Sequence, residues 1–280
     1  MAEVSQFPQR RINPFRVASP LDWVDRPIIP VKWMVDGAVP RGTVCLFSGP
    51  GSSGKSYLAL QMQIAAATMH RWCGLYIHPC RSFGLYCEDP ENVLHQRTVK
   101  ICEQYGTAVD SLEDMTLKAM DGEDATLWEA NKYGSQWRTT PLWSQICEYT
   151  NDVGVELLIL DTAARVFGGN ENSRQHVTAF IAELEKWAKP GGRAVILNIH
   201  PSKGGDPYSG STAWESSCRA HLALKRPKGY DAENPDADHL GRVLRTMKAN
   251  WGAVGGVIKL RWNRGVFAVD ETQIPLPYPD

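Results

Sequence analysis

One segment of the chain has the residue types and the spacing to hold a triphosphate. Residues 49–56 read Gly-Pro-Gly-Ser-Ser-Gly-Lys-Ser, which fills every fixed position of the pattern G-x-x-x-x-G-K-[ST]. Its glycines let successive backbone N–H groups point at phosphate oxygens, and a following helix adds the positive end of its dipole. The residues predicted to bind the nucleotide are Gly49, Pro50, Gly51, Ser52, Ser53, Gly54, Lys55, Ser56 and the adjacent Tyr57.

The flanking sequence puts this segment between a strand and a helix. The apolar run Val44-Cys45-Leu46-Phe47 precedes it, and residues 57–69 follow without Gly or Pro. Lys55 is expected to reach the β and γ phosphates, and the Ser56 hydroxyl to bind Mg²⁺. The alternative is a glycine turn beside a surface lysine, and it leaves the strand and helix context unexplained.

A second candidate ends the apolar run of residues 157–160. Asp161 follows four apolar residues, as expected where a buried parallel strand delivers a carboxylate to the edge of a sheet at which ligands bind. We therefore expect Asp161 to hold Mg²⁺ opposite Ser56. Apolar runs that end in Asp are common, so this prediction depends on the phosphate-binding segment upstream.

Hydrolysis also needs a group that orients and deprotonates a water molecule. Glu88 ends another apolar run, just before a helix that opens at Pro90, and it is the predicted base. Asp89 and Glu91 are rivals in the same turn. All three acids also suit a helix N-terminus on electrostatic grounds alone.

His200 follows the apolar run of residues 193–199 and precedes a glycine-rich loop, residues 201–211. A polar side chain here can sense the γ phosphate and relay its presence to a loop. A lone histidine is also compatible with a purely structural role.

Composition limits the broad class. The 280 residues are 43% apolar and 22% charged, as in ordinary globular proteins, and no run approaches the eighteen or so apolar residues that a membrane span needs. Seven cysteines without a C-x-x-C pair indicate reduced thiols, and residues 1–7 lack a leader pattern, so the cytoplasm is expected. The net charge of −1 counts mildly against nucleic-acid binding by the chain as a whole.

The organisation along the chain favours one α/β domain after an arm. Residues 1–32 are rich in Pro and Arg and predict an extended arm, while residues 33–280 predict the domain. Within the domain, residues 107–139 are polar and mixed, and we interpret them as a possible insertion. Apolar runs after residue 219 predict antiparallel strands added to a mostly parallel sheet that helices flank.

The motifs together resemble those of the RecA-like P-loop ATPases. The phosphate-binding segment, Cys87-Glu88-Asp89-Pro90, Ile159-Leu160-Asp161-Thr162 and residues 199–204 occur in the order and spacing of that family. The chain is most similar to the hexameric replicative helicases of the RepA family, from about Trp33 to about Asp270. Residues 210–212, Cys218-Arg219 and the segment 247–252 match two further family segments.

The resemblance implies an Mg²⁺-dependent ATPase with assigned residues. It makes Glu88 the catalytic glutamate, Asp161 the magnesium ligand and His200 the γ-phosphate sensor. It also makes Arg219 an arginine finger that reaches the ATP of a neighbouring subunit, with Lys248 near the same interface.

The family binds single-stranded DNA on two loops that face the centre of its ring. In this chain they correspond to residues 167–173 and 202–211. Arg165 and Lys203 are candidates for phosphate contacts, and Phe167 and Tyr208 for stacking on bases. Glu171 and Asp206 depart from a basic DNA-binding surface.

These features favour a hexameric motor on single-stranded DNA, with a replicative helicase as the leading hypothesis. A recombinase or annealing protein that forms filaments on single-stranded DNA is the second, because heterologous interfaces close into rings or extend into helices. A nucleotide switch or loader that does not translocate is the third, and a small-molecule kinase the last.

Overall fold

The computed structural model describes residues 18–131, 133, 134, 136–200, 212–231, 233, 234 and 237–270. The chain divides into two units between Pro30 and Val31. In the first unit, a short 3-10 helix, η1 (Pro20–Trp23), begins at Ser19, whose hydroxyl accepts a hydrogen bond from the Leu21 backbone N–H. The second unit carries all the other described elements.

The second unit alternates strands and helices along most of its length. Its elements are β1 (Trp33–Val35), β2 (Val39–Pro40), β3 (Thr43–Ser48), α1 (Lys55–Thr68), β4 (Ser82–Tyr86), α2 (Glu91–Tyr105), η2 (Val109–Ser111), β5 (Met115–Ala119), β6 (Trp128–Ala130), β7 (Trp137–Thr139), α3 (Pro141–Asp152), β8 (Leu157–Asp161), α4 (Ala163–Val166), β9 (Phe167–Gly168), α5 (Arg174–Ala188), β10 (Ala194–Ile199), α6 (Thr212–Ser217), β11 (Ala220–Lys225), β12 (Gly241–Ala249), β13 (Val257–Asn263) and β14 (Val266–Val269).

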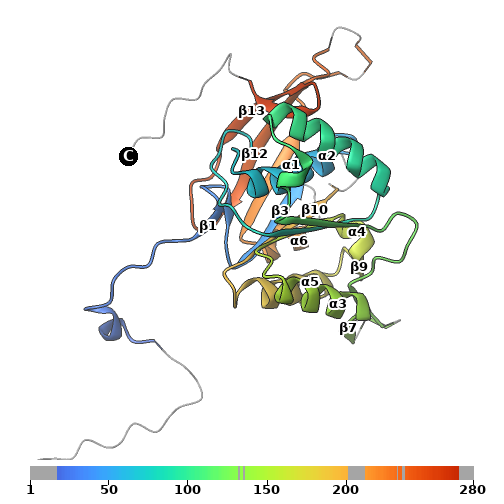
Figure 1. The fold of residues 1–280 in the computed structure, drawn as a ribbon. Coiled ribbons are helices and arrows are strands. Elements are labelled where there is room, and N and C mark those ends of the chain that lie inside the picture. Colours follow the sequence, from blue (N-terminus) through green and yellow to red (C-terminus); the bar gives the residue numbers. More distant parts are fainter. Residues whose placement is uncertain are drawn as a thin grey trace, which may run out of the picture. The chain divides into compact units, whose positions relative to one another are not determined.

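A large sheet forms the centre of this unit (Figure 1). Within the described residues it has nine strands in the order β14-β13-β12-β11-β3-β10-β8-β4-β5. Strands β11, β3, β10, β8, β4 and β5 run parallel, and β12, β13 and β14 continue the sheet antiparallel. The predicted α/β class, a mostly parallel sheet with antiparallel strands on its C-terminal side, is confirmed. The antiparallel part begins at β12, because β11 is parallel to β3.

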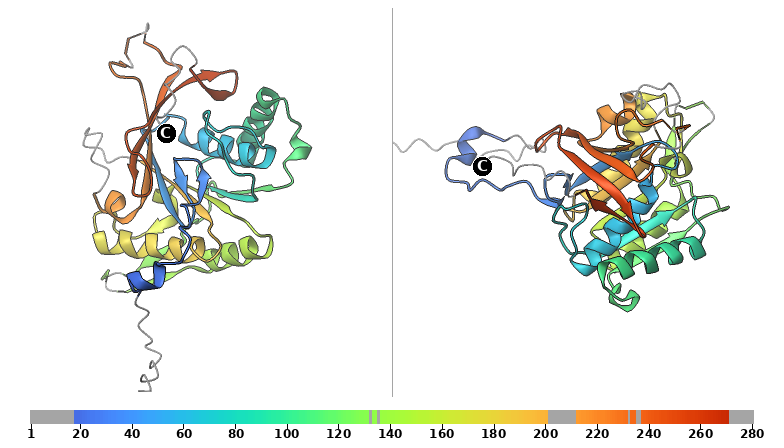
Figure 2. Two further views of the ribbon diagram at one scale, coloured as in Figure 1. Left: turned by 90° about the vertical axis from the view of Figure 1, so that its left-hand side faces the viewer. Right: turned by 90° about the horizontal axis from the view of Figure 1, so that it is seen from above.

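Helices cover both faces of the parallel part (Figures 1 and 2). On one face α1 and α2 pack over alternate residues such as Cys45 and Phe47 of β3, and on the other α3 and α5 pack over Val44 and Leu46. Burial on both faces explains why β3, β8 and β10 are continuous apolar runs rather than alternating ones.

The helices begin and end where local signals predict. The α5 helix starts after Ser173, whose hydroxyl accepts a hydrogen bond from the His176 backbone N–H. The α2 helix ends at Gly106, which adopts the left-handed conformation at φ 63°.

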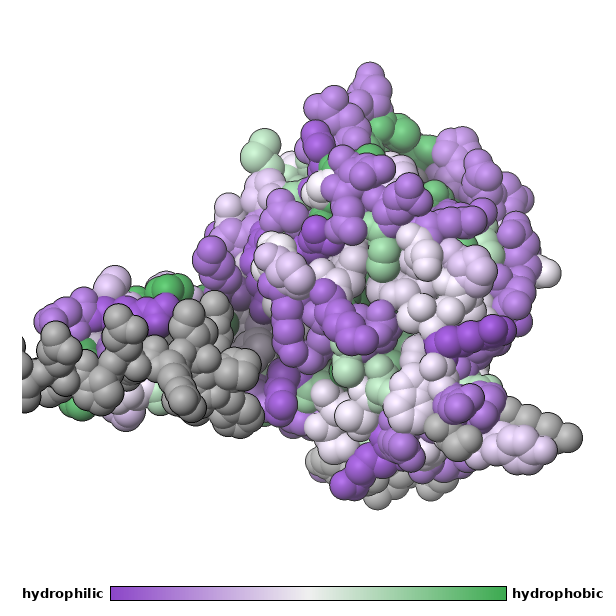
Figure 3. Space-filling model, turned by 90° about the horizontal axis from the view of Figure 1, so that it is seen from below, coloured by the Kyte–Doolittle hydropathy of each residue, from purple (hydrophilic) through white to green (hydrophobic). Residues whose placement is uncertain are grey.

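Figure 3 shows the molecule from below the view of Figure 1, from the side on which α3 and α5 lie. Hydrophilic residues cover much of this face.

The segment 107–139, interpreted from the sequence as a possible insertion, contributes to two sheets. Its strand β5 extends the main sheet beside β4. Its strands β6 and β7 form a small sheet with β9, and Trp128 on β6 stacks on Phe167 with ring centroids 5.4 Å apart. The segment therefore pairs with strands outside it, through β5 with β4 and through β6 with β9.

Two further findings concern membrane spans and the cysteines. Among the described residues, no helix has both the length and the apolar character to span a membrane. All seven cysteines are free thiols, and burial raises the pKa of Cys45 to about 12.

Candidate nucleotide-binding site

The predicted site residues meet at one edge of the main sheet. Ile199 pairs with Ser48, the last residue of β3, and Asp161 pairs with Tyr86, the last residue of β4. The carboxyl ends of β3, β4, β8 and β10 are therefore aligned, and the segments that follow them share this edge. In open parallel sheets, ligands bind at this position.

The phosphate-binding loop requires two of its glycines, Gly49 and Gly54, for steric reasons. Gly54 has φ 103°, and a Cβ there would lie 2.6 Å from the Phe267 ring. A Cβ on Gly49 would lie 2.5 Å from the Leu224 carbonyl oxygen. The tight turn from β3 into α1 leaves no room for a side chain at either position, so both must be glycine.

Lys55 lies at the start of α1 and points back across the loop. Its ammonium group donates hydrogen bonds to the carbonyl oxygens of Gly49, at 2.7 Å, and Pro50, at 3.0 Å. Burial lowers the Lys55 pKa, and the carboxylates of Asp161 and Glu88 oppose that shift. The ammonium is thus held where phosphate oxygens would approach the loop.

Asp161 is almost completely buried at the end of β8. The Asn198 side-chain amide donates a hydrogen bond to Asp161 Oδ1 at 2.8 Å. Burial raises the pKa of Asp161, while hydrogen bonds from Ser56 and Asn198 lower it. The Ser56 hydroxyl and the Asp161 carboxylate are hard oxygen donors, which fits Mg²⁺ held jointly by one carboxylate, a hydroxyl and nucleotide phosphates.

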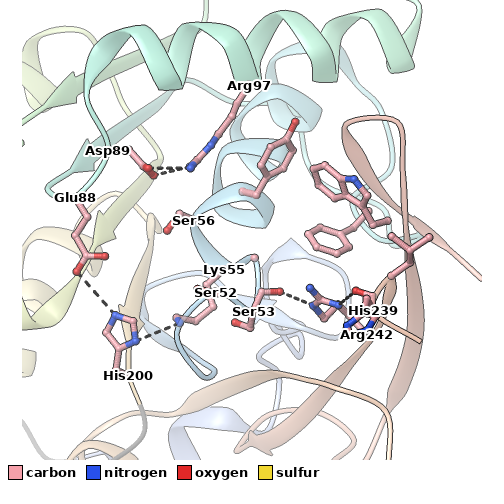
Figure 4. Close-up of a pocket in the computed structure, with 15 residues that line it drawn as sticks. Ser52, Ser53, Lys55, Ser56, Glu88, Asp89, Arg97, His200, His239 and Arg242 are labelled. Carbon is pink, nitrogen blue, oxygen red and sulfur yellow. Dashed lines mark hydrogen bonds and ion pairs between the residues drawn. The ribbon is translucent and has the colours of Figure 1, made fainter. Parts of the chain in front are cut away.

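The two acids after β4 have different neighbours (Figure 4). Both carboxylate oxygens of Asp89 accept hydrogen bonds from Arg97, at 2.5 and 2.8 Å. Glu88 instead points toward His200, and its Oε1 lies 3.9 Å from His200 Nε2. Nδ1 of the same imidazole lies 3.5 Å from Lys55 Nζ. His200 therefore bridges the predicted base and the phosphate-binding lysine.

A pocket of about 410 Å³ opens beside the loop, and its second wall comes from the C-terminal strands. Arg242 of β12 donates a hydrogen bond to the Ser53 carbonyl oxygen at 2.7 Å, and its guanidinium lies 5.5 Å from the Phe267 ring centroid. Trp262 of β13 packs edge-on against Tyr57, with centroids 4.7 Å apart. Tyr57 and Trp262 are half-buried and offer aromatic surface that suits the planar base of a nucleotide, with the buried Phe267 packed behind them.

This second wall was missed in the sequence. Arg242, Trp262 and Phe267 belong to no motif and are about 200 residues from the loop in sequence, and Arg97 of α2, which also lines the pocket, was missed as well. The only sequence signal is alternation in β12 and β13, which predicts the face of each strand but not the loop it contacts.

Two predicted residues lie away from this pocket. Arg219 is exposed and precedes β11, whose first residue, Ala220, pairs with Cys45 in the first half of β3. Lys248 pairs with His221 and donates a hydrogen bond to the Glu215 carbonyl oxygen at 2.6 Å. Neither lines the pocket of its own chain.

The structure describes two of the four candidate DNA-contacting residues, Arg165 and Phe167. Arg165 is exposed on α4, and its guanidinium donates a hydrogen bond to the Glu123 carbonyl oxygen. Phe167 is only 6% exposed among Trp128, Phe180 and Trp214, so its ring has no open face for a base. The sequence-based role of Phe167 in base stacking is thus not supported. Lys203 and Tyr208 lie outside the described residues.

Comparison with known families agrees with the geometry. A family model described as an AAA domain matches residues 9–206, which is more than half of the chain. The matched range includes the phosphate-binding loop, Glu88, Asp161 and His200, and it ends before β11. The comparison with curated proteins gives no match.

Proposed function

The chain belongs to the AAA domain family of P-loop ATPases, and from this premise we propose that it is a ring-forming, ATP-driven motor on single-stranded DNA, a replicative helicase of the RepA type. The observation that carries the proposal is the arrangement of Lys55, Glu88 and His200 around one loop, with Arg219 remote from it. Such a site is complete only when a neighbouring subunit supplies the arginine.

Each residue has a definite task in hydrolysis. Lys55 and the loop N–H groups bind the β and γ phosphates. Glu88 accepts the proton of the attacking water, because Asp89 is already engaged by Arg97. Mg²⁺, held by Ser56 and Asp161, would neutralise charge on the phosphates.

The position of Arg219 supports action on a neighbouring subunit. It precedes Ala220, which pairs with Cys45, so it lies level with Val44, four residues before Ser48. At about 3.3 Å per residue, the Arg219 backbone is about 13 Å along the sheet from the end of β3, after which its own loop begins. An exposed arginine here is suited to reach the triphosphate bound by another copy.

His200 supports coupling of hydrolysis to DNA. The imidazole contacts both Glu88 and Lys55, and His200 lies two residues before the segment 202–211, the second loop expected to bind DNA. Loss of the γ phosphate would change the surroundings of His200, and the chain that follows it would respond.

A second candidate, a switch or loader without translocation, gains support from Phe167. Its burial removes one of the two aromatic residues expected to stack on bases. A chain of this kind would hydrolyse ATP at a rate that single-stranded DNA does not change.

The deciding experiment measures ATP hydrolysis with and without single-stranded DNA, alongside native mass and negative-stain images. The motor proposal expects stimulation by DNA and closed rings. Filaments of variable length would instead support the recombinase. A rate of ATP hydrolysis that single-stranded DNA does not change, and that Lys55→Ala abolishes, would support the switch or loader.

A further inference from the structure

A second, strongly basic surface lies on the antiparallel end of the sheet, beside the nucleotide pocket, with which it shares Arg242. It is a groove of about 770 Å³ over strands β11, β12 and β13. The basic residues that line it are Lys225, Arg226, Lys228, Arg242, Arg245 and Lys259. This concentration of positive charge contrasts with the net charge of −1 of the whole chain.

The register explains why Lys225, Arg245 and Lys259 share a face, whereas Arg242 projects to the other side. Lys225 pairs with Val243, and Val243 pairs with Lys259, so the three side chains project to one side of the sheet. Arg245, two residues along β12, projects to the same side. The intervening Leu244 belongs to the apolar core, so the opposite face of these strands is buried.

Several of these cations are available to a ligand. Arg245, Lys259 and Lys228 are exposed, and within the part of the chain that the structure describes none of them forms an ion pair. Two carboxylates also line the groove: Asp238 contacts Arg261 at 3.1 Å, and Asp270 lies 4.0 Å from the same guanidinium. Both carboxylates lie against Arg261, whereas among the described residues no carboxylate lies within ion-pair distance of Arg245 or Lys259.

The spacing favours an extended anion. Lys225 and Lys259 lie two strand spacings apart, about 10 Å, and Arg245 lies about 7 Å along β12 from Val243. A ligand with repeating charge satisfies such an array better than one phosphate ion does. Val243 and Val257, half-buried between the cations, offer apolar surface to the bases of such a ligand.

We propose that this groove binds the phosphate backbone of a single-stranded nucleic acid, as a site separate from the two loops named above. Lys225, Arg245 and Lys259 contact successive phosphates across the three strands. The inference does not need the motor activity, because binding here requires neither ATP nor a ring.

The test is fluorescence anisotropy with a labelled 30-nucleotide dT strand, without nucleotide, over a range of salt concentrations. The double variant Arg245→Gln/Lys259→Gln should bind about tenfold more weakly. Its plot of log affinity against log salt should be less steep by about 1.4, since each lost contact to a single strand contributes about 0.7. The matched control, Arg71→Gln/Lys118→Gln, removes one exposed arginine and one exposed lysine elsewhere and should bind as the wild type does.

Two results would overturn the inference. One is unchanged dT binding by the groove variant when circular dichroism shows the same thermal midpoint as the wild type. The other is competition by poly-L-glutamate at the charge concentration at which unlabelled dT competes, which would assign the groove to an acidic protein partner. DNA stimulation of ATP hydrolysis is scored separately, so the groove and the motor proposal can fail independently.

Discussion

The turn after β4 presents two neighbouring carboxylates in different electrostatic settings. Asp89 is held by both nitrogens of the Arg97 fork, which orients it and offsets its charge. Glu88 has a side chain about half exposed to the pocket and faces His200. A general base needs a carboxylate free to accept a proton, so the proposed function gives Glu88, and not the adjacent Asp89, the role of the base.

We expect Glu88→Gln to lower the turnover of ATP about 10²- to 10⁴-fold, because the amide cannot accept the proton of the attacking water. The dissociation constant for ATP should stay within about threefold, since the amide has the shape of the carboxylate. Steady-state hydrolysis and titration with a fluorescent ATP analogue measure the two quantities. Glu91→Gln, an exposed acid in the same turn, is the control and should hydrolyse normally. Normal turnover in Glu88→Gln would move the base to another residue.

At the scale of elements, strand β12 links the C-terminal sheet to the phosphate-binding loop. Arg242 holds the Ser53 carbonyl oxygen and lies over Phe267, so one side chain fixes both the loop and the aromatic wall.

Arg242→Gln should lower the free energy of unfolding by about 1–3 kcal/mol and weaken ATP binding. Urea denaturation and ATP titration test these effects. Arg245→Gln, on the opposite face of the same strand, should change the free energy of unfolding by less than about 0.5 kcal/mol. A normal ATP affinity in Arg242→Gln would limit Arg242 to a structural role.

The elements that could be predicted from sequence are those whose signals are local. The α2 and α5 helices have apolar periodicity with Gly106 or Ser173 at an end, and β8 is a continuous apolar run before Asp161. Strand β5 has no such signal, because it is a half-exposed edge strand, so residues 115–119 were not recognised as part of the main sheet.

The candidate site likewise has one part that local sequence signals predict and one part that they do not. The loop, Glu88, Asp161 and His200 follow strand ends, and a parallel sheet brings strand ends together whatever the rest of the chain does. The second wall depends on the pairing of β12, β13 and β14 with β11, a long-range arrangement that alternation in one strand does not specify.

At the scale of the whole molecule, a buried histidine joins the central sheet to α6. His221 Nε2 lies 2.7 Å from the Ser48 hydroxyl oxygen, and Nδ1 lies 3.2 Å from a Glu215 carboxylate oxygen. Burial, reinforced by Lys225 and Lys248, lowers the pKa of His221 from 6.5 to about 4. Burial lowers the His221 pKa by more than the partly exposed Glu215 carboxylate raises it, so His221 is neutral in the folded protein at pH 7.

The unfolded chain therefore binds more protons than the folded one between about pH 6.5 and pH 4, and stability is lost as the pH falls through that window. The contribution of His221 amounts to about 2 kcal/mol between pH 7 and pH 5. Urea denaturation at the two pH values should show this loss in the wild type. In His221→Gln the loss should be about 2 kcal/mol smaller, whatever the stability of the variant at pH 7. An equal loss in both proteins would contradict the assignment.

The last prediction concerns the proposed assembly, because Arg219 is about 13 Å along the sheet from the end of β3, where its own loop begins. Arg219→Ala and Lys55→Ala should each be nearly inactive, the arginine loss alone costing about 10³- to 10⁵-fold. An equal mixture should recover up to about a quarter of wild-type hydrolysis, since that share of head-to-tail interfaces pairs an intact Lys55 with a neighbour's intact Arg219. Mixing Lys55→Ala with the double variant Lys55→Ala/Arg219→Ala is the control and should recover nothing. If native mass shows mixed assemblies and the first mixture still lacks activity, Arg219 does not act across the interface.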